Sequence, residues 1–334
     1  MICNGVFEGG GVKGIGLVGA VCAMEDAGYK FENVAGTSAG SIVASLLSVG
    51  YTGREIKDEM IKLDFSRLKG QTLLTHLGLP GKAIKLLLKN GVYDADYIRV
   101  WLEALLHKKN ITRFGEIRAY HTHGHDSKYR FQAIASDLSG SRMLVLPRDL
   151  HVFGLAPDKF SIATAVRMSI SIPVFYEPYI LTDSDGKSHV IVDGGLLSNY
   201  PIWVLDNRKT NPIIPTFGFK FSSSTSEEPR QNDYNSVLSI SDFTKAMIRT
   251  LLDAHDKHYI SVSRGDFQRT ITISTIINKN DKEHDISSVD FNISTEDMEA
   301  LFDNGYRSAE KFLRTWDFDK WKRQYRNETF RTAS

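Results

Sequence analysis

The stretch 31-FENVAGTSAGSIVASLLSVG-50 decides the fold, because a short apolar run, a serine flanked by glycines and a longer apolar run follow one another directly. The first run predicts a buried strand, and the second predicts a helix that stops at Gly50. Between them, Gly36, Ser38 and Gly40 spell G-x-S-x-G, a motif that makes a sharp turn from strand to helix. The setting that this motif requires is therefore present.

The residues before this stretch follow the same order. Residues 2–7 predict a strand, the glycine run beginning at Gly9 predicts a loop, and residues 12–28 predict a helix ended by Gly28. Two successive units of strand, loop and helix are typical of a parallel sheet with crossover helices. We therefore expect an α/β fold.

Further segments extend this pattern. We expect helices opened by Thr52 and Asp94, strands over 128–138 and 141–147, and a helix that begins at Phe160 and stops before Pro173. We also expect a hairpin of 177–181 with 188–195, a long helix over 235–262, and a final amphipathic helix with Met298, Leu301, Phe302, Tyr306, Phe312 and Leu313 on its apolar face. Nothing in the composition marks a linker between independent domains.

The composition excludes several classes of protein. The 334 residues are 42% hydrophobic and 24% charged, with a formal net charge of +1, so no nucleic-acid binding is expected. The two cysteines, Cys3 and Cys22, suit neither a metal site nor a disulfide framework, which favours a reducing compartment. No leader and no membrane-spanning run is recognised. We expect a cytoplasmic protein whose contact with a membrane, if it makes one, is peripheral.

Ser38 is the candidate nucleophile. A serine hydroxyl attacks an acyl group only when it is held rigidly, exposed, and close to a base, and the G-x-S-x-G turn does the holding. The alternative, that Ser38 merely caps a helix, is less favoured because glycines flank it on both sides.

The glycine loop has two interpretations. Gly9, Gly11 and Gly14 spell G-x-G-x-x-G, which is typical of dinucleotide sites, but the second strand does not end in the acidic residue that would hold a ribose. The backbone N–H groups of Gly9, Gly10 and Gly11 can instead stabilise an oxyanion at a helix N-terminus. We favour this interpretation and expect no cofactor.

The base is harder to find from the residues alone. The histidines His255, His258 and His284 lack the setting of a turn or strand end, so packing or solvent exposure is the favoured role of each. The triplet in "HTHGH" (121–125) has no accompanying acid or cysteine cluster, so no metal is expected. Asp193 follows an apolar strand and precedes Gly194 and Gly195, although "DGG" alone is also typical of a simple turn.

Together, "EGGGVKG", "GTSAG" and "DGG" resemble the patatin-like phospholipases, and "AVRMSISIPVFYEPY" and "DGGLLSNYP" are similar to bacterial members of that family. The resemblance implies a three-layer α/β/α fold with a mainly parallel central sheet. It also implies a Ser–Asp dyad of Ser38 and Asp193 without histidine, and an oxyanion loop of Gly9, Gly10 and Gly11. Gly14, Gly36, Gly40, Gly194 and Gly195 match motif glycines. Where the family often has Asp and Arg, this loop carries Glu8 and Lys13, which keeps the charges.

The resemblance covers residues 1 to about 220. We therefore expect a catalytic core over 1–220 and a C-terminal extension of helices and strands over 221–334, packed on the same domain. The implied activity is a lipid acyl hydrolase of the phospholipase A or lysophospholipase type, acting on a phospholipid or another acyl ester. The alternatives are an acyltransferase, an esterase of soluble esters, or a regulated lipid-binding effector with the same fold.

Two further segments bear on lipid contact. Residues 82–98 could form a lid, or simply core. The aromatic and basic segment 316–327 suits a membrane interface, and it equally suits a terminal helix docked on its own domain.

Overall fold

A computed structural model describes residues 1–63, 91–93, 95–119, 128–206, 212–222, 265–279 and 282–326. The strands of these residues are β1 (Ile2–Phe7), β2 (Lys30–Thr37), β3 (Gly91–Tyr93), β4 (Phe131–Asp137), β5 (Arg142–Leu146), β6 (Val174–Tyr176), β7 (Tyr179–Thr182), β8 (Ser188–Asp193), β9 (Thr216–Ser222), β10 (Thr270–Ser274), β11 (Ile276–Lys279) and β12 (Lys282–Asp285). The α-helices are α1 (Gly14–Asp26), α2 (Ala39–Ser48), α3 (Gly53–Ile61), α5 (Asp96–Lys108), α6 (Ile162–Ser169), α8 (Thr295–Leu313) and α9 (Phe318–Tyr325).

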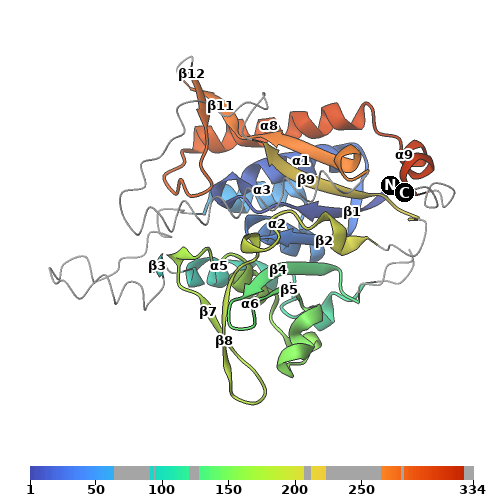
Figure 1. Ribbon diagram of the computed structural model, residues 1–334. Coiled ribbons are helices and arrows are strands. Elements are labelled where there is room, and N and C mark those ends of the chain that lie inside the picture. The colour runs from blue at the N-terminus through green and yellow to red at the C-terminus, as the bar shows by residue number, and fades with distance from the viewer. Residues whose placement is uncertain are drawn as a thin grey trace.

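An eight-stranded mixed sheet organises the molecule (Figure 1). Its order is β10-β9-β1-β2-β4-β8-β7, with β5 also paired to β4. Strands β10, β9, β1, β2 and β4 run parallel to one another, whereas β5 and β8 are antiparallel to β4, and β7 is antiparallel to β8. The parallel strands therefore end at one edge of the sheet, where α/β proteins bind their ligands.

The main core lies between one face of the sheet and the helices. Helix α1 has small residues, including Gly16 and Gly19, where α8 crosses it; a Cβ on Gly19 would lie 1.9 Å from the carbonyl oxygen of Phe302. On the other face, Val6 of β1 and Ala35 of β2 pack against residues 200–205. Because successive strand residues point to opposite faces, both faces of these central strands are covered.

Most of the elements expected from the sequence are confirmed, with bounds within a few residues. Thr52 caps α3 through a capping box with Glu55, and Gly28 and Gly50 have positive φ angles just beyond the ends of α1 and α2. Helix α5 begins at Asp96 rather than after Asp94, which lies outside the described residues together with the expected helix over 235–262 and most of the expected lid.

Two strands from the C-terminal part of the chain, β9 and β10, complete one side of the sheet. Strand β9 runs across residue 220 and pairs with β1 on one side and with β10 on the other, so the sheet continues past the expected boundary between core and extension. That division stays a prediction. Sequence reasoning missed both β9 and β10.

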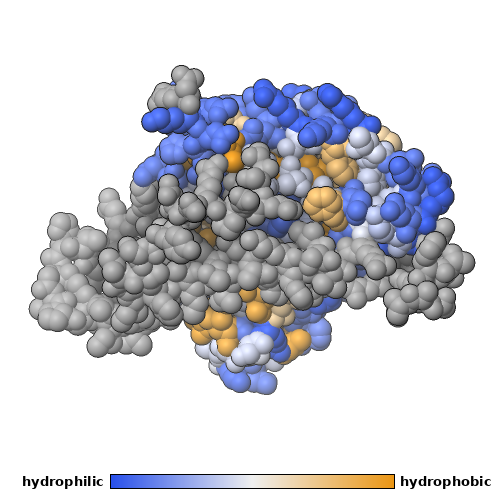
Figure 2. All heavy atoms as spheres, turned by 45° about the horizontal axis from the view of Figure 1, so that its top comes forward, coloured by the Kyte–Doolittle hydropathy of each residue, from blue (hydrophilic) through white to orange (hydrophobic). Residues whose placement is uncertain are grey.

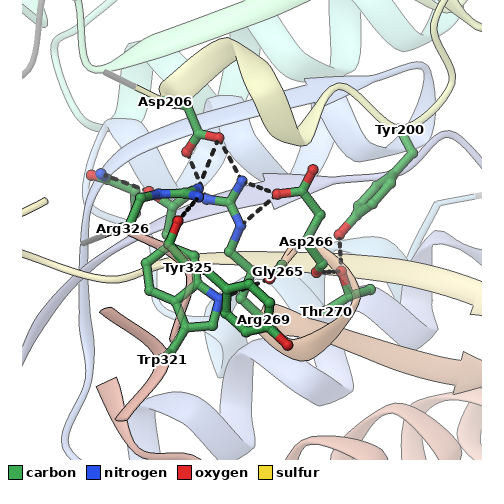
Figure 3. A network of polar contacts seen from close by, with 11 residues as sticks. Tyr200, Asp206, Gly265, Asp266, Arg269, Thr270, Trp321, Tyr325 and Arg326 are labelled. Atoms are coloured by element: carbon green, nitrogen blue, oxygen red, sulfur yellow. Dashed lines mark hydrogen bonds and ion pairs between the residues drawn. The ribbon is translucent and has the colours of Figure 1, made fainter. Parts of the chain in front are cut away.

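A buried ion network fastens the C-terminal strands and helix to the rest of the molecule (Figure 3). Arg269 is 1% exposed, and its guanidinium donates to both carboxylate oxygens of Asp206, at 2.6 and 2.5 Å, and to Oδ1 of Asp266. The Arg269 guanidinium also lies 5.4 Å from the centre of the Trp321 ring. The network therefore joins the segment after β8 to β10 and α9.

Helices α8 and α9 show how the C-terminal region meets solvent and core. The outward face of α8 carries both signs of charge and forms a hydrophilic surface (Figure 2). Trp321 is 5% exposed and donates to the carbonyl of Gly265, and the Trp316 ring lies 5.2 Å from that of Phe217. These aromatic side chains thus serve to dock the segment on its own domain. Within the described residues, no helix is both long and apolar enough to cross a bilayer.

Replacing Arg269 by Met should lower the free energy of unfolding by about 3–5 kcal/mol, because the buried Asp266 carboxylate would lose its counter-charge and the half-buried Asp206 would keep, among the described residues, only Arg326, 3.8 Å away. Urea unfolding measures this loss. Arg307→Met, on the exposed face of α8, is the matched control and should change stability by less than about 0.5 kcal/mol. Equal midpoints for the Arg269 variant and the wild type would contradict the assignment.

Candidate active site

Ser38 occupies a strained turn between β2 and α2. Its φ of 50° and ψ of −125° lie in a region that residues other than glycine rarely adopt, at a cost of order 1–3 kcal/mol. The flanking glycines permit the turn: a Cβ on Gly36 would lie 2.3 Å from the carbonyl of Gly40, and one on Gly40 would lie 2.3 Å from the Phe7 oxygen. The expected G-x-S-x-G turn is therefore formed for a steric reason.

The Ser38 backbone is anchored by a side chain from another element. Its N–H donates to Oγ of Ser169 at 3.0 Å, and the Ser169 hydroxyl donates to the carbonyl of Ile134 at 2.6 Å. The residue before it is also held, because Thr37 Oγ1 donates to the carbonyl of Ser198. Ser38 is only 6% exposed.

Asp193 ends β8 on the opposite side of β4 from Ser38. Thr37 pairs with Ile134, and Asp193 pairs with the next residue, Ala135. Two strand spacings separate the two backbones by about 10 Å, a gap that a serine and an aspartate side chain can span from its two sides. A Cβ on Gly194 would lie 2.2 Å from the carbonyl of Ile134, so glycine lets the chain turn closely over β4 here.

The carboxylate of Asp193 is buried and only half satisfied. Oδ1 accepts the N–H of Gly195 at 2.7 Å, whereas Oδ2 makes no hydrogen bond within the described residues. Burial raises the pKa of Asp193 to about 7, against the lowering effect of the nearby Ser38 hydroxyl and of the Gly195 amide. The Ser38 hydroxyl is thus near enough to favour the charged form, although the geometry falls short of a hydrogen bond, as is common before substrate binds.

The three glycines of the loop differ in what their amides do. The Gly9 N–H donates to the carbonyl of Asn199 at 3.1 Å, and within the described residues the amides of Gly10 and Gly11 donate to nothing. Gly11 has a φ of +56°, and a Cβ there would lie 1.8 Å from the Ser288 carbonyl oxygen. The loop adjoins the serine, since a Cβ on Gly9 would lie 3.2 Å from that of Ser38. In the part of the chain that the structure describes, the loop beside Ser38 therefore has two amide donors without an acceptor.

Glu8 fixes the start of this loop. Its carboxylate is 4% exposed, accepts from Lys220 Nζ at 2.7 Å, and also accepts from the backbone amide of Phe221. Lys13 lies with its Nζ 5.2 Å from the centre of the Phe221 ring. The two charged residues of the loop thus both meet β9.

The described histidines lie elsewhere. His284 is exposed on β12, and His189 is the one buried histidine of the described residues, with its Nε2 3.1 Å from Asp183. None of the described histidines hydrogen-bonds to Ser38 or Asp193, whereas His255, His258 and the "HTHGH" triplet fall outside the described residues. No described group of three or more His, Cys, Asp or Glu side chains is placed to hold a metal ion.

Sequence reasoning missed two residues that organise the site. Asn199 bonds twice to Gly9, with its carbonyl oxygen and through Nδ2 at 3.3 Å, and it lies in the quoted stretch "DGGLLSNYP". Ser169 lies in "AVRMSISIPVFYEPY", but a serine near the end of a helix carries no sign of its partner. Both stretches contribute to the resemblance to the family, but neither indicates that its residue contacts the glycine loop or Ser38.

Comparisons with known proteins identify chains that are similar to this one. The family model of patatin-like phospholipase matches residues 5–206. The uncharacterized protein YqhO of Bacillus subtilis is 36% identical over 321 residues, which cover 95% of this chain and 100% of YqhO. The probable lipid hydrolase 463L of invertebrate iridescent virus 6 is 26% identical over 199 residues, or 59% of this chain and 61% of that protein.

Solved structures share the fold. VipD from Legionella pneumophila matches with a TM-score of 0.51 and 17% identity over 93% of this chain, which spans 66% of the VipD chain. At that identity the likeness concerns the fold alone. The expected patatin-like α/β/α fold with a mostly parallel sheet is confirmed.

Replacing Asp193 by Asn should stabilise the protein more at high pH than at low pH. The folded-state pKa of about 7 lies above the unfolded value, so the wild type loses stability as pH rises through this range. The variant lacks this loss, and its advantage should grow by about 3 kcal/mol between about pH 5 and pH 8. Urea unfolding at both pH values measures it. Asp185→Asn, in the exposed β7–β8 turn, should show no such growth; an Asp193 variant that behaved like it would contradict the raised pKa.

Proposed function

The chain belongs to the patatin-like phospholipase family, and on that premise we propose that it is a lipid acyl hydrolase with Ser38 as nucleophile and Asp193 as base. Family membership and the relative described as a probable lipid hydrolase support hydrolase activity on lipids. The proposed substrate is a phospholipid or lysophospholipid ester, reached from one side of a membrane surface.

The proposed reaction has two halves. Asp193 Oδ2 accepts the proton of the Ser38 hydroxyl while Oγ attacks the ester carbonyl carbon, and the carbonyl oxygen becomes an oxyanion. As that intermediate collapses, the alcohol leaves with the proton from Asp193 and the acyl group stays on Ser38. Water then gives a proton to Asp193 and attacks the acyl-enzyme, which releases the fatty acid and returns the proton to Ser38.

One observation carries the proposal: a buried carboxylate oxygen of Asp193, without a hydrogen-bond partner among the described residues, lies near a serine that the backbone holds in a strained turn. Strain of this kind persists only where the surroundings over-determine it, and it is typical of functional sites. The raised pKa of Asp193 also makes the carboxylate a better proton acceptor near neutral pH.

The free amides of Gly10 and Gly11 support the oxyanion role of the loop. They stand at the start of the short helix that leads into α1, and a donor of this kind is worth about 3 kcal/mol of transition-state stabilisation. In this proposal Gly9 has a different part from its neighbours, because its amide is already bonded to Asn199. It ties the loop to the segment that follows Asp193.

Wild-type protein should release fatty acid from defined phospholipid and lysophospholipid vesicles, and Ser38→Ala and Asp193→Asn should each lower kcat by at least about 1000-fold. The double variant should be no worse than either single variant, since the two side chains act as a unit. Mass spectrometry of the products gives both the rate and the ester bond cleaved.

Ser48→Ala, near the end of α2, and Asp185→Asn are matched controls that should keep wild-type rates, because neither contacts the site. A fluorophosphonate probe should label Ser38 in the folded wild type. Absence of labelling would point to a lipid-binding module, while turnover of soluble esters alone, or acyl transfer to an acceptor other than water, would redirect the substrate assignment.

The value of kcat/KM for an uncharged ester should rise with pH and level off above a midpoint near 7. Only the unprotonated carboxylate of Asp193 can accept the serine proton, and the fraction in that form grows as pH rises through its pKa of about 7. Initial rates at low substrate concentration measure the profile. A profile that is flat or falls over this range would count against Asp193 as the base.

A further inference from the structure

Ser169, the last residue of α6, and Ser171, two residues later, contact the backbone of the two proposed catalytic residues. We propose that the segment Ser169–Ser171 sets the separation of Ser38 and Asp193, with Ser169 as a positioning residue that acts through the Ser38 amide. This inference rests on the proposed function. The Ser169 side chain positions Ser38 and takes no part in the reaction itself.

The first contact is made by a hydroxyl whose direction is fixed. A serine hydroxyl has one proton, and that of Ser169 goes to the carbonyl of Ile134 at 2.6 Å. Its oxygen therefore faces the Ser38 N–H, 3.0 Å away, as an acceptor. Ser169 is 0% exposed, so bulk solvent does not compete for this hydrogen bond. The hydrogen bond thus holds the amide of the one residue in the turn that has a strained φ angle.

The second contact lies two residues further along. The Ser171 carbonyl accepts the N–H of Asp193 at 2.9 Å. The carbonyl of Ile134, which accepts from Ser169, also lies directly under Gly194, where a Cβ would come within 2.2 Å of it. Three parts of the chain therefore meet at one place: the end of α6, the middle of β4 and the turn after β8. Their contacts fix the backbone at both residues of the proposed dyad.

A buried arginine holds this segment in turn. Arg167 is 4% exposed and donates to Ser171 Oγ at 2.6 Å, to the Glu177 carbonyl at 3.1 Å, and to Asp96 Oδ1 at 2.9 Å. Its planar guanidinium joins the loop after α6, the turn between β6 and β7, and the start of α5. The segment is thus fixed independently of Ser38 and Asp193, as a positioning element must be.

Ser169→Ala should lower kcat by about 10–100-fold and change KM by less than about threefold, because the serine is displaced while the substrate site stays. Ser169→Cys, which is close in size but a poor acceptor, should show the same pattern if the alanine variant does not fold. Ser48→Ala removes an equally buried hydroxyl that bonds only within α2, and should match the wild type.

Hydrogen exchange tests the inference without relying on activity. The amide of Ser38, followed in a peptide over residues 36–40, should exchange faster in both Ser169 variants, whereas peptides of β1 and α8 should keep wild-type rates. Unchanged exchange at residue 38, or a kcat equal to that of Ser48→Ala, would overturn the inference. If the wild type hydrolyses no ester, the hydrolase proposal fails, and the exchange rates still decide whether Ser169 holds the Ser38 amide.

Discussion

The carboxylate of Asp193 is buried, and no cation of the described chain lies close enough to offset its charge. The arrangement of the surrounding residues depends on this constraint. One oxygen is satisfied by the Gly195 amide and the other is left for the Ser38 hydroxyl, so the group is neither fully stabilised nor exposed. A charge in that position is costly unless its surroundings are rigid and closely fitted. The glycines at 36, 40 and 194 supply the close fit, because each stands where a side chain would meet a backbone atom.

Local sequence predicts the half of the site that is built locally. The turn at Ser38, its strand and its helix are adjacent in the chain, and glycines mark them because no other residue fits. Asp193 is marked only as a strand end before two glycines, and its partnership with Ser38 came from resemblance to a family. Strand β9 was missed although its phenylalanines occupy alternate positions of 217–221, and its pairing with β1, about 210 residues earlier, leaves no mark in the local sequence. Nothing in the local sequence indicates that the Gly9 amide is already hydrogen-bonded, because its acceptor, the Asn199 carbonyl, lies 190 residues later in the chain.

Contacts distant in sequence complete the site from the outside. Glu8 is bound by residues of β9, and the loop from Ser198 to Tyr200 bonds to Thr37, Gly9 and Thr270. Since the Thr270 hydroxyl donates to the Asp266 carbonyl, the Tyr200 hydroxyl donates to Thr270. Residues beyond those matched by the family model therefore fasten the glycine loop and the turn after Asp193 to the sheet, next to the ion network of Arg269.

The place of β9 in the sheet also determines when a newly made chain can acquire its site. A ribosome completes β1 about 210 residues before it completes β9, an interval of roughly 10–40 s at about 5–20 residues per second. Throughout that interval one edge of β1 has no partner, and the Glu8 carboxylate lacks both the Lys220 ammonium and the Phe221 amide. About two thirds of the 334 residues must therefore be synthesised before the glycine loop can reach its final arrangement, and the proposed site should stay inactive for that part of translation.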